Sequence, residues 1–97
     1  MTEPIPVILH TDIGTDIDDT WALGMMLLRK ELKPLLILTD TGDTVNRAKI
    51  CARMLENARR TEVEVAAGIP GEPSKCPIHQ MEWIKEYRLS DYPGKYH

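Results

Sequence analysis

Acidic side chains are concentrated in one short stretch of the chain. Four aspartates lie within eight residues, after an apolar run and before a helical pattern: Asp12, Asp16, Asp18 and Asp19. Carboxylates this close repel one another, and the start of a helix needs only one capping residue. We therefore expect a positive partner among them. The candidates are a hard divalent cation bound through oxygen, the positive end of the following helix, or both.

The elements around these aspartates predict an α/β fold. Apolar runs at residues 5–10, 35–39 and 63–67 are typical of strands, and two helical patterns lie between them. The order strand, helix, strand, helix, strand predicts an open parallel sheet of Rossmann-like βαβαβ units with right-handed crossovers. The first run lacks clean alternation, which favours a strand buried on both faces.

The second helical pattern predicts a cap and two distinct faces. We expect Thr44 to cap this helix. Its periodicity predicts an apolar face (Val45, Ile50, Ala52, Leu55, Ala58) and a solvated face (Arg47, Lys49, Arg53, Glu56).

Proline and glycine interrupt the chain beyond the third predicted strand. Residues 1–70 are expected to form the βαβαβ portion, which binds metal and ribose. Residues 71–97 are expected to form an extension with about two helical turns near residues 81–87.

The expected sheet brings more carboxylates to the same edge. Asp40 and Asp43 follow the second strand, and ligands of open α/β sheets lie beyond the carboxyl ends of the strands. Neighbouring strands lie about 4.8 Å apart, so up to six carboxylates would converge there. The pattern predicts an anionic pocket that is ready for a metal, although any single aspartate is equally consistent with a helix cap or a turn.

Composition narrows the classes of function. The chain has 97 residues and a net charge of −3, and it has no basic stripe, which argues against nucleic-acid binding. Its apolar runs are far shorter than the roughly 20 residues that span a bilayer, so no membrane role is expected. With only Cys51 and Cys76 and no secretory signal, we expect a cytoplasmic protein with reduced thiols.

The acidic stretch and its flanks resemble a known signature. Residues 7–14 and 18–23 resemble the N-terminal motif of the inosine-uridine-preferring nucleoside hydrolases, which has the form D-x-D-x-G followed by D-D-A and an apolar helix. Asp12, Gly14 and the pair Asp18–Asp19 match it, and Thr15–Asp16 resembles an insertion seen in one branch of the family. The likeness continues at residues 38–43 and 65–68 and covers residues 5–70.

This resemblance implies an enzyme, a nucleoside N-ribohydrolase that uses Ca²⁺ to cleave the N-glycosidic bond of a ribonucleoside. It implies that Asp12 is a metal ligand and the general base, and that Asp19 is a second metal ligand. By the same resemblance, Asp18 accepts hydrogen bonds from the ribose hydroxyls, and Asp43 contacts the ribose or orients Asp12. The chain would then be the N-terminal part of a larger nucleoside hydrolase fold.

Two departures from the family pattern leave alternatives open. His10 stands where the motif usually has its first aspartate, so it either supports the metal, as Asp16 would, or is a strand-end residue with a satisfied side chain. Family members are more than twice as long, and neither His79 nor His97 lies in a convincing motif for the leaving-group acid. We therefore expect a homo-oligomer or a completing chain. The alternative function is a non-catalytic metal- or ribose-binding remnant or an interaction subunit.

Overall fold

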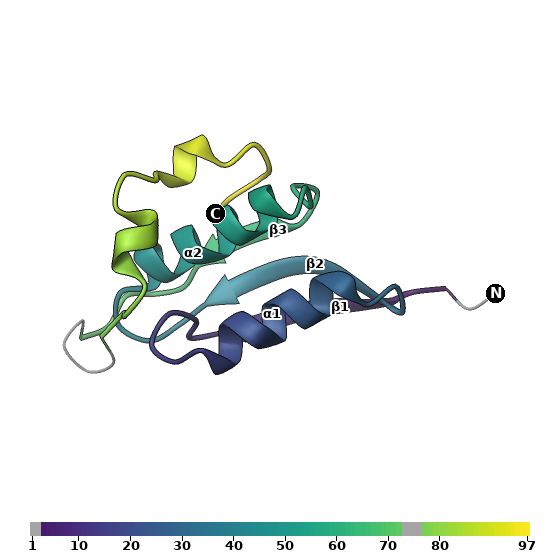
Figure 1. Ribbon diagram of the computed structural model, residues 1–97, viewed down its shortest axis with the longest axis horizontal. Helices are drawn as coiled ribbons and strands as arrows, with labels where there is room; N and C mark the ends of the chain where they lie inside the picture. The colour runs from purple at the N-terminus through teal and green to yellow at the C-terminus, as the bar shows by residue number, and fades with distance from the viewer. Residues whose placement is uncertain (1–2, 73–76) are drawn as a thin grey trace.

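A computed structural model describes residues 3–72 and 77–97 and confirms the α/β fold. Its three strands are parallel and lie in the order β1-β2-β3, with a helix in each crossover (Figure 1). The elements are β1 (Ile5–Thr11), α1 (Asp18–Leu28), β2 (Leu32–Thr39), α2 (Thr44–Asn57) and β3 (Glu64–Ala67), followed by the 3-10 turns η1 (Met81–Ile84) and η2 (Leu89–Asp91). The predicted helical turns near residues 81–87 are thus reduced to the shorter η1.

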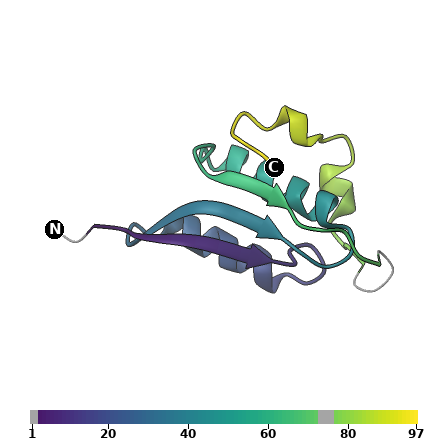
Figure 2. The same ribbon diagram turned by 180° about the vertical axis from the view of Figure 1, so that it is seen from behind.

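Both helices cover the same face of the sheet. In Figure 2 the three strands lie in front of α1 and α2, and in Figure 1 they lie behind them. Two right-handed crossovers that step in the same direction across a sheet place their helices on one side. The expectation that the first strand is buried on both faces is therefore wrong. β1 is an edge strand in which Thr11 is buried while Ile8 is 62% exposed.

A bulge explains how β2 begins earlier than predicted. Val7 lies opposite Pro34 and Ile8 lies opposite Leu36, so Leu35 is an extra residue in β2. Proline cannot donate a ladder hydrogen bond and is tolerated in sheets at such irregularities. The strand therefore continues through Pro34 back to Leu32.

The core lies between the helices and the covered face of the sheet. Leu23 and Met26 of α1 pack towards β2, and α2 supplies the larger share of the buried apolar side chains, including Ile50, Cys51 and Leu55. This one-sided arrangement concentrates the core beneath α2, where the described C-terminal residues also pack.

The C-terminal segment folds back over α2 and reaches the sheet. Ile84 and Tyr92 are buried in the core, and the Tyr92 hydroxyl donates to the carbonyl of Val63 at 2.6 Å. Beyond them the chain pairs with β3 through a parallel bridge between Val65 and Tyr96. Figure 1 shows this yellow segment passing above α2 and ending near β3. The described part of the extension is thus packed on the βαβαβ unit.

Two expectations for α2 are wrong. Asp43, rather than Thr44, is the N-cap, and its carboxylate accepts a hydrogen bond from the backbone N–H of Asn46 at 3.1 Å. The Thr44 hydroxyl instead donates to the carbonyl of Gly68 at 2.7 Å. Val45 is exposed and Arg47 is fully buried, so the two residues exchange the faces that periodicity assigned to them.

Within the residues that the structure describes, no helix has the length and apolar character needed to cross a membrane.

Two buried acids predict a loss of stability at alkaline pH. Burial raises the pKa of the Cys51 thiol to about 12 and that of the Tyr92 phenol to about 12. A raised folded-state pKa contributes stability below the unfolded-state value that is lost as pH rises towards the folded-state value. We expect the free energy of unfolding, measured by urea titration with circular dichroism, to fall as pH rises from 9 to 12.

The variant Cys51→Ala separates the thiol from the other groups. It should lower stability at every pH through lost packing, yet flatten the slope above pH 9, where each ionising group contributes at most ~1.4 kcal/mol per pH unit. A wild-type free energy of unfolding that stays constant between pH 9 and 12 would contradict the prediction.

Candidate functional site

The end of β1 and the start of α1 are tied together by one carboxylate. Asp19 Oδ2 accepts a hydrogen bond from the Thr11 hydroxyl at 2.6 Å and from the backbone N–H of Asp12 at 3.2 Å. Asp19 lies in the first turn of α1, and Thr11 is the last residue of β1. The loop between them therefore closes on itself and brings the Asp12 and Asp19 side chains together.

The two carboxyl groups titrate as a pair. The hydrogen bond with Asp19 raises the pKa of Asp12, and burial adds to that increase. The Thr11 hydroxyl lowers the pKa of Asp19 by stabilising its carboxylate. Asp19 therefore ionises first, while Asp12 keeps its proton to higher pH. A cation near the two carboxylates would favour the ionised form of both.

A buried arginine supplies part of the expected positive charge. Arg47 donates from Nε to the carbonyl of Thr41 at 2.7 Å, and from one terminal nitrogen to the carbonyls of Asp12 (2.9 Å) and Ile13 (3.1 Å) and the Thr15 hydroxyl (2.8 Å). One guanidinium thus joins the loops that follow β1 and β2. Its charge also lowers the pKa of both Asp12 and Asp19.

The position of Arg47 in the sequence hints at its buried role, although helical periodicity places it on the solvated face. Arg47 lies four residues after the N-cap of α2, where the helix dipole disfavours a cation. A cation in that position needs carbonyl or carboxylate partners from elsewhere in the fold. The β1 and β2 loops supply them here.

His10 is satisfied by a neighbouring strand end and does not join the acidic pair. Its Nε2 lies 2.9 Å from Asp40 Oδ2, and both side chains are about half exposed. Of the two alternatives for His10, the structure favours the strand-end residue with a satisfied side chain. The same contact takes Asp40 out of the expected carboxylate cluster.

The other predicted site residues also lie apart from the pair. Asp43 is held at the start of α2 by the backbone and side chain of Asn46 (3.1 and 2.5 Å). Asp16 and Asp18 are exposed, and within the described ranges neither forms a hydrogen bond or an ion pair with Asp12 or Asp19.

The expected convergence of six carboxylates is therefore not found. Across residues 3–72 and 77–97, no three His, Cys, Asp or Glu side chains are grouped so as to hold a metal ion. The reason is local: His10 and the N-terminus of α2 each hold one of the carboxylates that follow β2. Asp12 and Asp19 remain as two neighbouring carboxylates.

A second segment closes over the acidic loop. Gly14 has a φ of 114°, and a Cβ at that position would lie 2.8 Å from Ile50 Cδ1. The carbonyl of Gly14 accepts a hydrogen bond from the backbone N–H of His79 at 2.8 Å, and Gln80 Nε2 donates to the Thr20 hydroxyl at 3.2 Å. Residues 78–80 therefore lie against the acidic loop and the start of α1, while the His79 side chain is exposed.

Comparison of the chain with known proteins found no matching family model, no matching curated protein and no matching solved structure.

The Arg47 contacts predict that even the conservative substitution Arg47→Lys lowers the stability of the fold substantially. Arg47→Lys keeps the charge but cannot reproduce the planar fork, so several carbonyls lose their donor. We expect the free energy of unfolding in urea to fall by about 3 kcal/mol, since single hydrogen bonds to charged groups contribute about 1.5–3 kcal/mol. Amides of residues 12–15 should also exchange with deuterium faster.

The matched control is Arg88→Lys, because the Arg88 side chain is largely exposed and its ion pair with Asp91 is long, at 3.9 Å. This change should alter stability by less than about 0.5 kcal/mol. Equal effects of the two substitutions would show that Arg47 does not join the loops.

Proposed function

We propose that the loop after β1 is the cation-binding end of an N-ribosyl hydrolase, with Ca²⁺ as cofactor and a ribonucleoside as substrate. The observation that supports this most strongly is the placement of Asp19 beside Asp12 at the carboxyl end of β1, where Asp19 Oδ2 accepts from the Asp12 backbone N–H and the two side chains shift each other's pKa. These are the two positions to which the resemblance to nucleoside hydrolases assigns the metal ligands. The parallel βαβαβ sheet also places them at the edge where such folds bind ligands.

The donor chemistry of this pair suits a hard divalent ion. Calcium takes six to eight oxygen ligands, supplied by carboxylates, carbonyls and water. A cation between Asp12 and Asp19 would offset the repulsion between the two carboxylates, which also raises the pKa of Asp12. Since the described residues bring only these two carboxylates together, the remaining oxygens must come from water, from the ribose hydroxyls or from another polypeptide.

The roles of the side chains in this proposal are those that the resemblance implies. The chemistry that bound calcium supplies is easier deprotonation of water near the anomeric carbon. Asp12 accepts that proton at its carboxylate, and Asp19 stays ionised because Thr11 donates to it. Asp18 accepts hydrogen bonds from the ribose hydroxyls. Asp43 contacts the ribose through the lone pairs that its two hydrogen bonds with Asn46 leave open.

A second candidate function is non-catalytic binding of a metal ion or ribose. It is favoured by the surroundings of the histidines that might protonate a leaving base. His97 Nε2 bonds to Glu64 on β3 at 2.6 Å, and His10 bonds to Asp40. If no leaving-group acid reaches the pair, the site binds without turnover.

Calorimetric titration with Ca²⁺, and with Mg²⁺ for comparison, tests the cation site. We expect calcium to bind in preference to magnesium, and Asp19→Ala to weaken binding by at least about tenfold, equivalent to ~1.4 kcal/mol. Glu86→Gln removes an exposed acid far from the loop and is the matched control. Absence of calcium binding to the wild-type chain would contradict the proposal.

An assay of nucleoside cleavage at saturating calcium separates the two candidate functions. Asp12→Asn should lower the rate by about 10²- to 10⁴-fold, which is the usual contribution of a general base. Undiminished cleavage by this variant would show that Asp12 is not the base. Calcium binding by the wild-type chain with no cleavage of any ribonucleoside would favour the non-catalytic function.

A further inference from the structure

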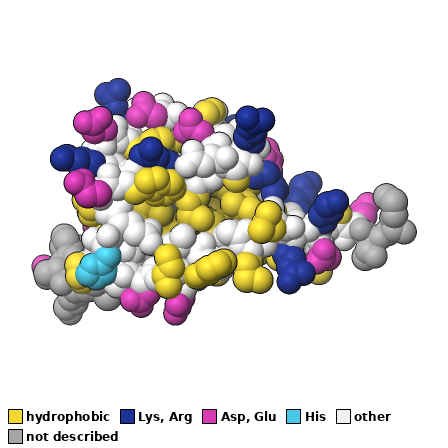
Figure 3. All heavy atoms as spheres, in the orientation of Figure 1, with side chains coloured by type: hydrophobic (Ala, Val, Ile, Leu, Met, Phe, Trp, Pro, Cys, Tyr) yellow, Lys and Arg dark blue, Asp and Glu magenta, His cyan; other side chains and the backbone are white. Residues whose placement is uncertain are grey.

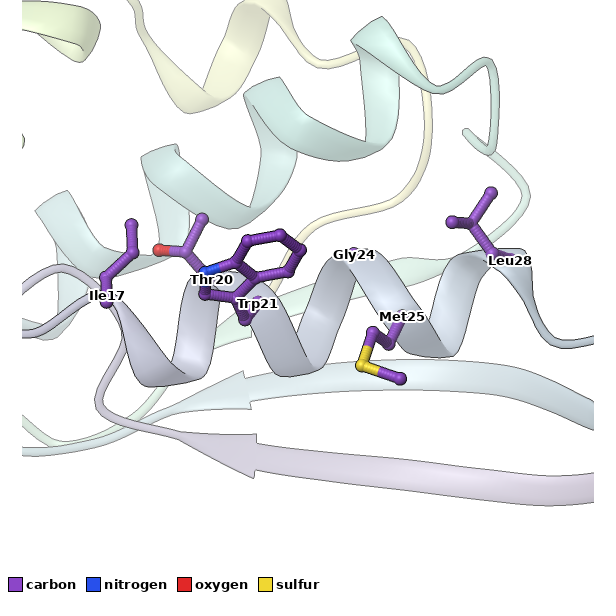
Figure 4. A pocket seen from close by; sticks show the side chains of 6 residues that line it. All are labelled: Ile17, Thr20, Trp21, Gly24, Met25 and Leu28. Atoms are coloured by element: carbon purple, nitrogen blue, oxygen red, sulfur yellow. The ribbon is translucent and has the colours of Figure 1, made fainter.

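An apolar stripe runs along the outer face of α1. Figure 4 shows its side chains on the side of the helix that faces away from the sheet, where they line a depression of about 210 Å³. Trp21 is 67% exposed and Leu28 is 83% exposed. Large apolar side chains gathered on a surface mark a site of interaction. The stripe consists of Ile17, Thr20, Trp21, Gly24, Met25 and Leu28.

The stripe has a gap at its centre. Apart from the neighbouring residues and the backbone of α1 itself, no atom of the described chain lies within 4 Å of the position that a Cβ would occupy at Gly24. Glycine inside a helix costs about 1 kcal/mol relative to alanine, and no contact within the described chain requires its small size. The gap can therefore accept a side chain from outside the chain.

The two ends of α1 carry opposite charges. Asp16 and Asp18 are exposed at its N-terminal end. At its C-terminal end a second depression is lined by basic side chains next to Leu27 and Leu28. Figure 3 shows yellow side chains over this region with magenta near one end, while dark blue, with some magenta among it, lies at the other. The basic residues of this depression are Arg29, Lys30, Lys33 and Arg60.

We propose that a second copy of this chain occupies the stripe, with the two α1 helices antiparallel around a two-fold axis near Gly24 and Met25. This arrangement sets the acidic end of each helix against the basic end of the other, and it also opposes their dipoles. A parallel arrangement would place like charges together. Because the contact is the same on both copies, it closes as a dimer.

The same arrangement places the apolar side chains of the two helices opposite one another. With the axis between Gly24 and Met25, Trp21 of one copy lies across from Leu28 of the other. Met25 of one copy then enters the gap at Gly24 of the other. α1 has 11 residues, so its length is about 16 Å. A contact of this size is small, and we expect a dissociation constant in the micromolar range.

Sedimentation equilibrium of the full chain tests this association. The mean mass should rise from 11.0 kDa towards twice that value as concentration increases through the micromolar range. Added salt should weaken the association because opposite charges meet at both ends. A chain that stays monomeric up to about 0.5 mM would overturn the proposal and leave the stripe to a different protein.

A pair of charged substitutions tests the register. Trp21→Glu and Leu28→Lys each place a charge against an apolar side chain of the second copy, so each variant alone should be monomeric. When they are mixed, the new carboxylate of one chain faces the new amine of the other, and association should return. Ile69→Glu is the control, because Ile69 lies outside α1 and is 93% exposed.

Each result of this experiment bears on a specific part of the proposal. If either single variant still dimerises, the outer stripe of α1 is not the contact surface. If both single variants are monomeric and their mixture also stays monomeric, the antiparallel register is wrong. Loss of association in Ile69→Glu would show that the contact lies elsewhere.

Gly24→Leu distinguishes a blocked interface from a misfolded chain. Leucine is the better helix former, and its Cβ meets no atom of the described chain beyond the backbone of α1 and the neighbouring residues, so the monomer should gain about 0.5–1 kcal/mol of stability. The same side chain fills the gap that Met25 of the second copy would enter, so association should be lost. A variant that still dimerises would overturn the packing. Asp12 and Asp19 are unchanged in all of these variants, so the outcome does not depend on the cation site.

Discussion

The guanidinium of Arg47 determines the geometry at the carboxyl end of the sheet. It is fully buried, and burying a charge costs several kcal/mol unless hydrogen bonds replace its water. The replacement comes from backbone carbonyls at Asp12, Ile13 and Thr41, which belong to two different loops. Neither loop can move independently without leaving the charge unsatisfied. The left-handed φ of 73° at Thr41 shows the conformation that the β2 loop adopts at this contact.

This constraint decides what the acidic loop can do. With its backbone held by Arg47, the loop directs the Asp12 N–H and the Thr11 hydroxyl to the same oxygen of Asp19. The guanidinium favours the ionised forms of both carboxyl groups, yet it also offsets part of the charge that would attract a metal ion. A cation here depends on the direct geometry of two carboxylates more than on a general negative potential. That is why the placement of Asp12 and Asp19 carries more weight than the number of aspartates nearby.

The one-sided arrangement of the helices leaves two apolar surfaces without a partner inside the described chain. One is the open face of the sheet, where Ile8 is exposed, and the other is the outer stripe of α1. They differ in character. The stripe has a gap at Gly24 and opposite charges at its ends, so its shape and charge specify an orientation for whatever packs on it. The open sheet face offers no comparable asymmetry.

The sequence by itself determined the order of the elements, the parallel sheet and the position of the acidic loop between β1 and α1. These features follow from local patterns, because strand and helix periodicities depend on residues that are close in sequence. The proximity of Asp12 and Asp19 could likewise be predicted from the sequence, because a single loop connects them.

Only the tertiary structure decided which long or polar side chains meet across elements. The burial of Arg47 depends on carbonyls more than thirty residues away, and a helical pattern shows only that the side chain lies on a given face. The pairing of His10 with Asp40 depends on the register of β1 against β2, and the capping by Asp43 depends on the turn before α2. The contacts of Asp40 and Asp43 keep their carboxylates away from the acidic pair, and Arg47 adds a positive charge beside it. The composition of the acidic cluster was therefore set by long-range geometry that local spacing does not encode.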